Sequence, residues 1–193
     1  VQGAPAQIFI SAAPEWMDVV QSDGLIDDAT RRDLLGNRLV LIGHGTGRPG
    51  VEIGPGLDLP ALMAGGKLAM GMVDAVPAGQ YGKEALETLG LWPGVAAEVA
   101  QVENVRAALA LVASGEVPLG IVFASDATAG LAAGDGITVL GVFPDDSHRP
   151  ILYPAALLRG AGPEAAAFFD HLADPTAQEI FRAEGFVLPA TDG

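Results

Sequence analysis

The sequence contains no cysteine, which excludes disulfides, zinc–thiolate centres and thiol catalysis. Basic residues are also few: 10 Lys and Arg stand against 24 Asp and Glu, and the formal net charge is −14. Because this charge repels phosphate backbones and anionic lipid surfaces, no nucleic-acid partner is expected. The longest apolar runs, such as residues 107–113, fall far short of the roughly 20 residues that a membrane-spanning helix needs, so the chain is not expected to span a membrane.

Half of the residues are hydrophobic, and a chain of 193 residues is long enough for one large or two small domains with a packed core. The N-terminal stretch VQGAPAQIFIS carries neither a Met nor a recognisable signal peptide, and its apolar strand begins almost at once. We therefore expect that part of the protein precedes this chain.

Periodicity and turn residues predict a chain in which strands alternate with helices. Before residue 67 we expect strands at residues 7–11 and 38–43, and helices at 14–21, 28–35 and 59–63. After it we expect strands at 68–72, 98–102, 119–123, 137–142 and 151–158, and helices at 78–89, 104–113, from about 126, at 163–173 and at 175–184. This alternation is typical of an α/β fold with mainly parallel sheets flanked by helices. In such sheets the ligand site lies at the carboxyl ends of the strands, where helices begin.

The order of the elements indicates two lobes joined by two crossings. Residues 39–43 would carry the chain out of the first lobe, and residues 151–158 would carry it back. We therefore assign residues 1–40 with 151–193 to the first lobe and residues 41–150 to the second. Two crossings of this kind form a hinge about which lobes can close.

Small residues open the predicted helix at 78–89, where Pro77, Ala78 and Gly79 follow a strand. Asn104 and Val105 occupy the same position one strand–helix unit later. The first N–H groups of a helix have no intrahelical acceptor, and this end carries about +0.5 of an elementary charge. Two such ends at one edge of a sheet form a site for an anion. From spacing alone, ordinary strand-to-helix turns remain the alternative.

Three other motifs favour purely structural roles. GTGRPG at residues 45–50 matches the dinucleotide pattern GxGxxG, but prolines and glycines follow where a helix should begin, which predicts a loop. The Asp and His residues of PDDSHRP, at 144–150, lack further metal ligands at suitable spacing and indicate a polar turn. Asp126 is expected to cap the next helix rather than to accompany Ser125 in a nucleophile turn. Because nothing combines a nucleophile, a base and an orienting group, we do not expect an enzyme.

Several segments, read in order, resemble the periplasmic molybdate-binding proteins of ABC importers. They are GAPAQIFISAAPEWMD, DDATRRDLLGNRLVLI, VPAGQYGKEALETLG, VENVRAALALV, GEVPLGIVFASDA, FPDDSHRPILYPAAL and QEIFRAEGF. The likeness runs from residue 3 to about residue 188. It implies a two-lobed, type II periplasmic-binding-protein fold that closes around molybdate or tungstate and needs no cofactor. It also implies an ABC-transporter permease as partner and a periplasmic location.

The resemblance carries ligand-binding residues over to this chain. The VPAG segment corresponds to a backbone N–H donor at Ala78, with Pro77 and Gly79 beside it. The ENVR segment corresponds to a second backbone donor at Val105, next to Asn104. The oxyanion is thus expected to be held by neutral donors, without direct coordination of its metal atom by the protein.

Two departures from the family pattern bear on the site. The family has Tyr at the end of the PLGIV strand, and Phe123 stands there in this sequence, so one hydroxyl donor is missing. The family's two ligand-binding serines lie upstream of GAPA, in a segment that this chain lacks, and the first lobe is therefore expected to be incomplete. The alternatives are a binding protein for sulfate or another oxyanion, or a truncated form with an impaired site. A further alternative is the sensing domain of a transcription regulator. Such a protein is expected to have a DNA-binding helix pair or a basic face, and the sequence shows neither.

Overall fold

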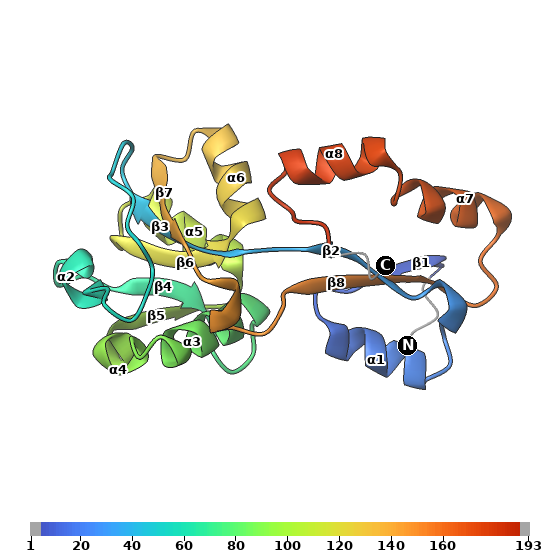
Figure 1. Cartoon of the computed structure of the whole chain (residues 1–193), viewed down its shortest axis with the longest axis horizontal. Coiled ribbons are helices and arrows are strands. Elements are labelled where there is room, and N and C mark those ends of the chain that lie inside the picture. Colours follow the sequence, from blue (N-terminus) through green and yellow to red (C-terminus); the bar gives the residue numbers. More distant parts are fainter. Residues whose placement is uncertain (1–4, 190–193) are drawn as a thin grey trace. The chain divides into compact units, whose positions relative to one another are not determined.

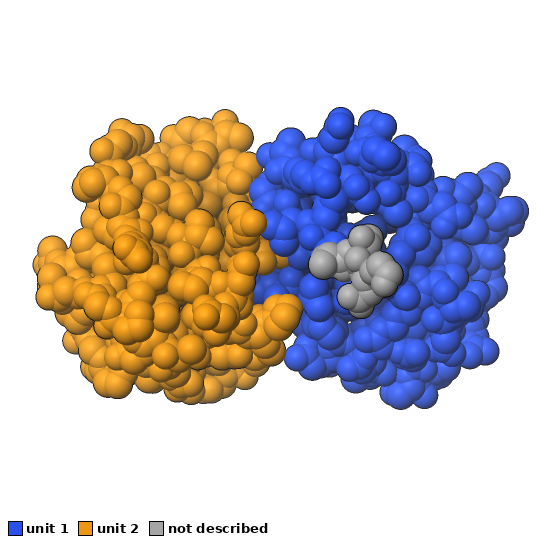
Figure 2. Space-filling view, in the orientation of Figure 1, with its two compact units in different colours: residues 1–36, 151–193 blue, residues 37–150 orange. Residues whose placement is uncertain are grey.

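The computed structural model describes residues 5–189. The chain divides into two compact units, Val1–Gly36 with Ile151–Gly193 and Asn37–Pro150, which Figure 1 shows as ribbons and Figure 2 colours separately. Residues 37–40, expected in the first lobe, belong to the second unit. The reason is that Leu39 pairs with Phe123, and Val40 with Val122, inside the sheet of that unit.

The second unit is built on a five-stranded sheet with the order β5-β4-β6-β3-β7. Its strands are β3 (Leu39–His44), β4 (Leu68–Gly71), β5 (Val99–Val102), β6 (Leu119–Phe123) and β7 (Ile137–Val142). β4 runs parallel to both β5 and β6, whereas β3 pairs antiparallel with β6 and β7. The parallel part of the sheet is therefore the part that alternates with helices along the chain.

Helices of the second unit flank this sheet (Figure 1). They are α2 (Leu59–Met63), α3 (Pro77–Thr88), α4 (Trp92–Val95), α5 (Val105–Ala113) and α6 (Ala124–Ala133), with the 3-10 turns η2 (Ala96–Glu98) and η3 (Asp145–Ser147). On α3, Tyr81, Ala85 and Leu86 recur at helical spacing and are buried. No helix formed by residues 5–189 is long and apolar enough to cross a membrane.

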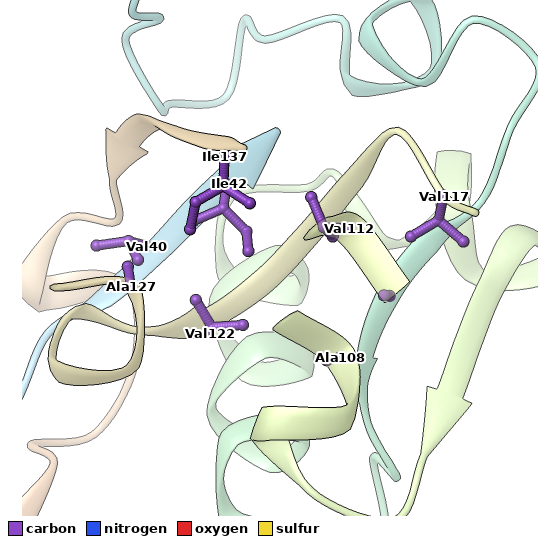
Figure 3. Close-up of a cluster of buried hydrophobic side chains, with 9 residues drawn as sticks. Val40, Ile42, Ala108, Val112, Val117, Val122, Ala127 and Ile137 are labelled. Carbon is purple, nitrogen blue, oxygen red and sulfur yellow. The ribbon is translucent and has the colours of Figure 1, made fainter. Parts of the chain in front are cut away.

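A cluster of buried aliphatic side chains joins the sheet to helices α5 and α6 (Figure 3). Val40, Ile42 and Val122 contribute from the strands, and Ala108 and Val112 contribute from α5. Full burial of one aliphatic side chain of this size stabilises a fold by about 1.5–3 kcal/mol. This core therefore fixes α5 on the sheet, and the position of its N-terminus follows from that packing.

The first unit is built on a three-stranded sheet with the order β1-β8-β2. The strands are β1 (Ile8–Ile10), β2 (Arg32–Gly36) and β8 (Leu152–Leu157), and the accompanying helices are α1 (Pro14–Ser22), α7 (Pro163–His171) and α8 (Pro175–Ala183). β8 pairs antiparallel with both neighbours, which departs from the mainly parallel sheet expected in each lobe. β1 and β2 run in one direction, and β8, which follows the second unit in the chain, lies between them in the other.

The segment 28–35 is not the helix that its sequence predicts, but the 3-10 turn η1 (Asp28–Thr30) followed by β2. Asp27 caps the turn, because its Oδ1 accepts a hydrogen bond from the Ala29 N–H at 3.2 Å. At the end of β2, the Gly36 N–H donates to the Val187 carbonyl at 2.7 Å and the Val187 N–H donates back to Gly36 at 3.0 Å. Pairing with segments distant in sequence thus overrides the local helical signal.

Candidate functional site

Three helices begin at the same edge of the sheet in the second unit. β4 is followed by α3, β5 by α5 and β6 by α6. Because β4 runs parallel to β5 and β6, the carboxyl ends of the three strands, and therefore the N-termini of the three helices, share one edge. The candidate residues of the sequence all fall on this edge of the second unit.

The N-terminus of α3 presents backbone donors rather than reactive side chains. Pro77 is the first helical residue, and the N-cap residue Val76 makes no side-chain hydrogen bond to the helix. The first regular bond joins the Gln80 N–H to the Val76 carbonyl at 2.9 Å, so helix geometry leaves the N–H groups of Ala78 and Gly79 without an intrahelical acceptor. Ala78 as a whole residue is 1% exposed, and its methyl side chain carries no hydrogen-bonding group, so its backbone N–H is the group that could donate to a ligand.

Gly79 is required by packing at the start of α3. A Cβ on Gly79 would lie 2.1 Å from the Gly71 carbonyl oxygen at the end of β4. A Cβ on Gly71 would in turn lie 2.5 Å from Cγ1 of Val76. The two glycines therefore let the helix begin directly against the strand, which the sequence interpretation, based on access for a ligand, did not foresee.

The N-terminus of α5 is capped by a side chain. Asn104 has an extended backbone and stands just before the helix, where its Oδ1 accepts a hydrogen bond from the Ala107 N–H at 2.9 Å. The helix begins at Val105, one residue later than predicted. This cap uses the N–H of the third helical residue and leaves those of Val105 and Arg106 without an intrahelical acceptor.

Phe123 ends β6 and is the N-cap residue of α6, although it makes no capping bond. Phe123 as a whole is 8% exposed, and its ring contacts Tyr81 of α3 edge to face, with 6.3 Å between ring centroids. The aromatic ring therefore packs between the starts of α3 and α6, and it offers no hydroxyl to a ligand.

Asp126 does not cap α6, contrary to the sequence prediction, because the helix begins at Ala124 and Asp126 lies inside its first turn. Burial raises the pKa of the Asp126 carboxyl, and the Arg106 guanidinium, whose Nε lies 3.9 Å from Oδ1, opposes the rise. Ser125 accepts a hydrogen bond from the Asn37 side chain at 2.9 Å. These polar groups thus tie neighbouring elements together and do not form a nucleophile turn.

Two further motifs form the loop and the turn that were predicted. Residues 45–50 form no helix, and Gly45 and Gly47 have positive φ angles of 89° and 70°, as in a loop. Residues 145–147 form the turn η3. Within residues 5–189, no group of three or more His, Cys, Asp or Glu side chains could hold a metal ion.

Sequence reasoning missed a cluster of polar and aromatic side chains that includes Tyr81 and Glu84 of α3. Tyr81 is 1% exposed and contacts the rings of both Phe123 and His148. Arg149 makes hydrogen bonds to Glu84 and lies over the Tyr81 ring. The segment SHRP did stand out in the sequence, but nothing local in it indicates a partner 65 residues away.

The chain is similar to solute-binding proteins in both sequence and structure. The family model of bacterial extracellular solute-binding proteins matches residues 1–187. The chain is 44% identical over 188 residues to the molybdate-binding protein ModA of Escherichia coli (strain K12), a match that covers 96% of this chain and 72% of the relative. It is 37% identical over 187 residues to the ModA protein of Haemophilus influenzae, with the same two coverages.

Among solved structures, the periplasmic molybdate-binding protein of Azotobacter vinelandii is similar with a TM-score of 0.75 and 25% identity. The match covers 97% of this chain and 80% of that chain. The resemblance inferred from sequence segments, and the α/β binding-protein fold that it implies, are therefore confirmed.

Proposed function

This chain belongs to the family of bacterial extracellular solute-binding proteins, and we propose that it binds molybdate or tungstate and delivers the anion to an ABC importer. The observation that carries the proposal is the pair of helix N-termini, α3 at Ala78 and α5 at Val105, at one edge of the parallel strands. The similarity to two proteins named as molybdate-binding supports the choice of ligand.

The bound oxyanion accepts hydrogen bonds from the backbone N–H groups of Ala78 and Val105. Charge-assisted bonds of this type are short and strong, and the helix ends add favourable electrostatic potential. Neutral donors also avoid the burial of a counter-cation, whose desolvation is costly. Pro77 and Gly79 set the start of α3, and Asn104 sets the start of α5, so these three residues support the site without donating side-chain bonds to the anion.

The two compact units act as the two lobes of the binding protein. Closure of the lobes about the crossings near residues 36 and 150 commits the anion to transport, on the microsecond-to-millisecond scale of such motions. The protein works in the periplasm, and its partner is the permease of an ABC transporter. No catalytic step is part of this function.

The test is a calorimetric and thermal-shift titration of the 193-residue chain with sodium molybdate, tungstate and sulfate, with sodium chloride at equal ionic strength as the control. We expect molybdate and tungstate to raise the melting temperature, because a ligand that binds only the native state stabilises it. Sulfate binding as tight as molybdate binding would replace the proposal by a general oxyanion site. No shift with any of the three anions would overturn the binding function of this chain.

A further inference from the structure

Arg149 holds the last residues of the second unit against α3. Its backbone N–H donates to Oε1 of Glu84 at 2.8 Å, and its Nη1 donates to Oε2 of the same carboxylate at 2.8 Å. Its Nη2 donates to the Gln80 side chain at 3.3 Å. One residue thus engages both oxygens of one carboxylate and a second acceptor one helical turn nearer the N-terminus of α3.

The same guanidinium lies over the Tyr81 ring, 4.5 Å from its centroid. Tyr81 is 1% exposed and also contacts the rings of Phe123 and His148. A cation over a partly desolvated aromatic face is favourable, and Tyr81 follows the helix start at Pro77 by about one turn. We call Arg149, Glu84, Gln80 and Tyr81 the Arg149 clamp.

The Arg149 clamp lies directly before a crossing between the two units. Arg149 is followed by Pro150, the last residue of the second unit, and the next residue belongs to the first unit. The other crossing is anchored in a similar way: Asn37, the first residue of the second unit, donates to Ser125 at 2.9 Å, and the Ala124 N–H donates to the Arg38 carbonyl at 2.9 Å. Each crossing is therefore tied to a helix that begins at the candidate site, α3 in one case and α6 in the other.

We propose that Arg149 is a positioning residue, which makes the exit segment of the second unit and the N-terminus of α3 one rigid body. This inference rests on the proposed function. Flexing about the crossing then begins after Arg149 and not within residues 143–149, so the anion-binding helix end moves with the crossing. Lys cannot replace Arg149 in this role, because an ammonium group lacks the planar fork that bonds Glu84 and Gln80 while lying over Tyr81.

The test compares Arg149→Gln, Arg149→Lys, Glu84→Gln and the double variant Arg149→Gln/Glu84→Gln. The readouts are the molybdate dissociation constant from calorimetry and the amide hydrogen exchange of residues 78–84 and 149 in ligand-free protein. We expect each single variant to weaken molybdate affinity by about fivefold or more, a typical size for coupling between sites. The double variant should lose no more affinity than the single variant with the larger loss, because both substitutions remove the same interaction. Exchange at residue 149 and in the first turns of α3 should rise together.

The matched control is Arg31→Gln, which removes another Arg–carboxylate pair, to Asp18 in the first unit at 2.6 Å. Both pairs are partly exposed, and such pairs contribute little to global stability, so the melting temperature of ligand-free protein should change little in either variant. A purely structural role for Arg149 would lower that temperature without a change in affinity. Unchanged affinity in both Arg149→Gln and Glu84→Gln would overturn the proposal.

Hydrogen exchange separates this inference from the proposed function. If the unmodified chain binds none of the anions, the binding function fails, but exchange in Glu84→Gln still decides whether the clamp holds α3. Unchanged protection of residues 78–84 in that variant would overturn the inference independently of any ligand.

Discussion

Gly79 and Gly71 lie so close together that a Cβ on Gly79 would stand 2.1 Å from the Gly71 carbonyl oxygen. The Gly71 carbonyl oxygen belongs to the backbone and not to a flexible side chain, so moving it away would cost free energy. The first turn of α3 is thus built against the end of β4, and this contact sets the position of the neighbouring Ala78 backbone N–H.

Gly79→Ala should destabilise the protein by about 1–3 kcal/mol, because the added methyl group overpacks the contact between α3 and β4. Urea unfolding measures the loss. Gly54→Ala is the control, since nothing lies within 4 Å of a Cβ at that position. Equal stability of the two variants would show that α3 can shift without cost.

Val105→Pro should weaken molybdate binding about tenfold to a hundredfold, the value of one hydrogen bond to a charged group. The substitution removes a single N–H at the first helical position, where proline is favoured, and the preceding Asn104 is already extended, as proline requires. Val105→Ala keeps the N–H and should keep the affinity. Calorimetry on both variants checks this, and equal affinities would exclude the Val105 N–H as a ligand.

Phe123→Tyr should strengthen molybdate binding by about tenfold to a hundredfold, because it supplies the hydroxyl donor that this chain lacks at the end of β6. The Phe123 ring already packs against Tyr81, so the variant is expected to keep the fold. Phe123→Leu controls for loss of the ring alone. An unchanged dissociation constant in Phe123→Tyr would mean that a hydroxyl at this position does not reach the anion.

Asp126 makes stability depend on pH in a direction that the structure determines. Burial raises the pKa of its carboxyl above the ordinary value of 3.8, while Arg106 opposes the rise. Between 3.8 and the raised value, the folded state binds more protons than the unfolded chain, so this group lowers the free energy of unfolding as pH rises through that window. Below 3.8 both states are protonated, and the cost of the buried charge is absent.

The comparison of wild type with Asp126→Asn isolates this contribution. The stability of the wild type relative to the variant should fall as pH rises from about 3.8 and then level off above the folded-state pKa. Urea unfolding at several pH values measures the difference. Arg106→Gln should extend the fall to higher pH, since it removes the charge that opposes protonation of Asp126. A difference that rises with pH would contradict the assignment.

Most strands and helices followed from local patterns, and the exceptions have a common cause. The buried stripe of α5 and the proline at the start of α3 are local features, and both helices begin within one residue of the prediction. The segment 28–35 failed because β2 is stabilised by pairing with β8 and by the bonds between Gly36 and Val187, which lie far away in sequence.

The sequence by itself determined the alternation of strands and helices and the two helix ends at Ala78 and Val105, because periodicity, capping and turn residues act over a few neighbouring positions. The fold family followed from the resemblance of several sequence segments to a known family. Tertiary structure alone decided that Gly79 is needed against Gly71 and that Arg149 holds α3 through Glu84. These relationships join residues whose packing and hydrogen-bond partners are set by the assembled sheet, and no pattern of neighbouring residues encodes such contacts.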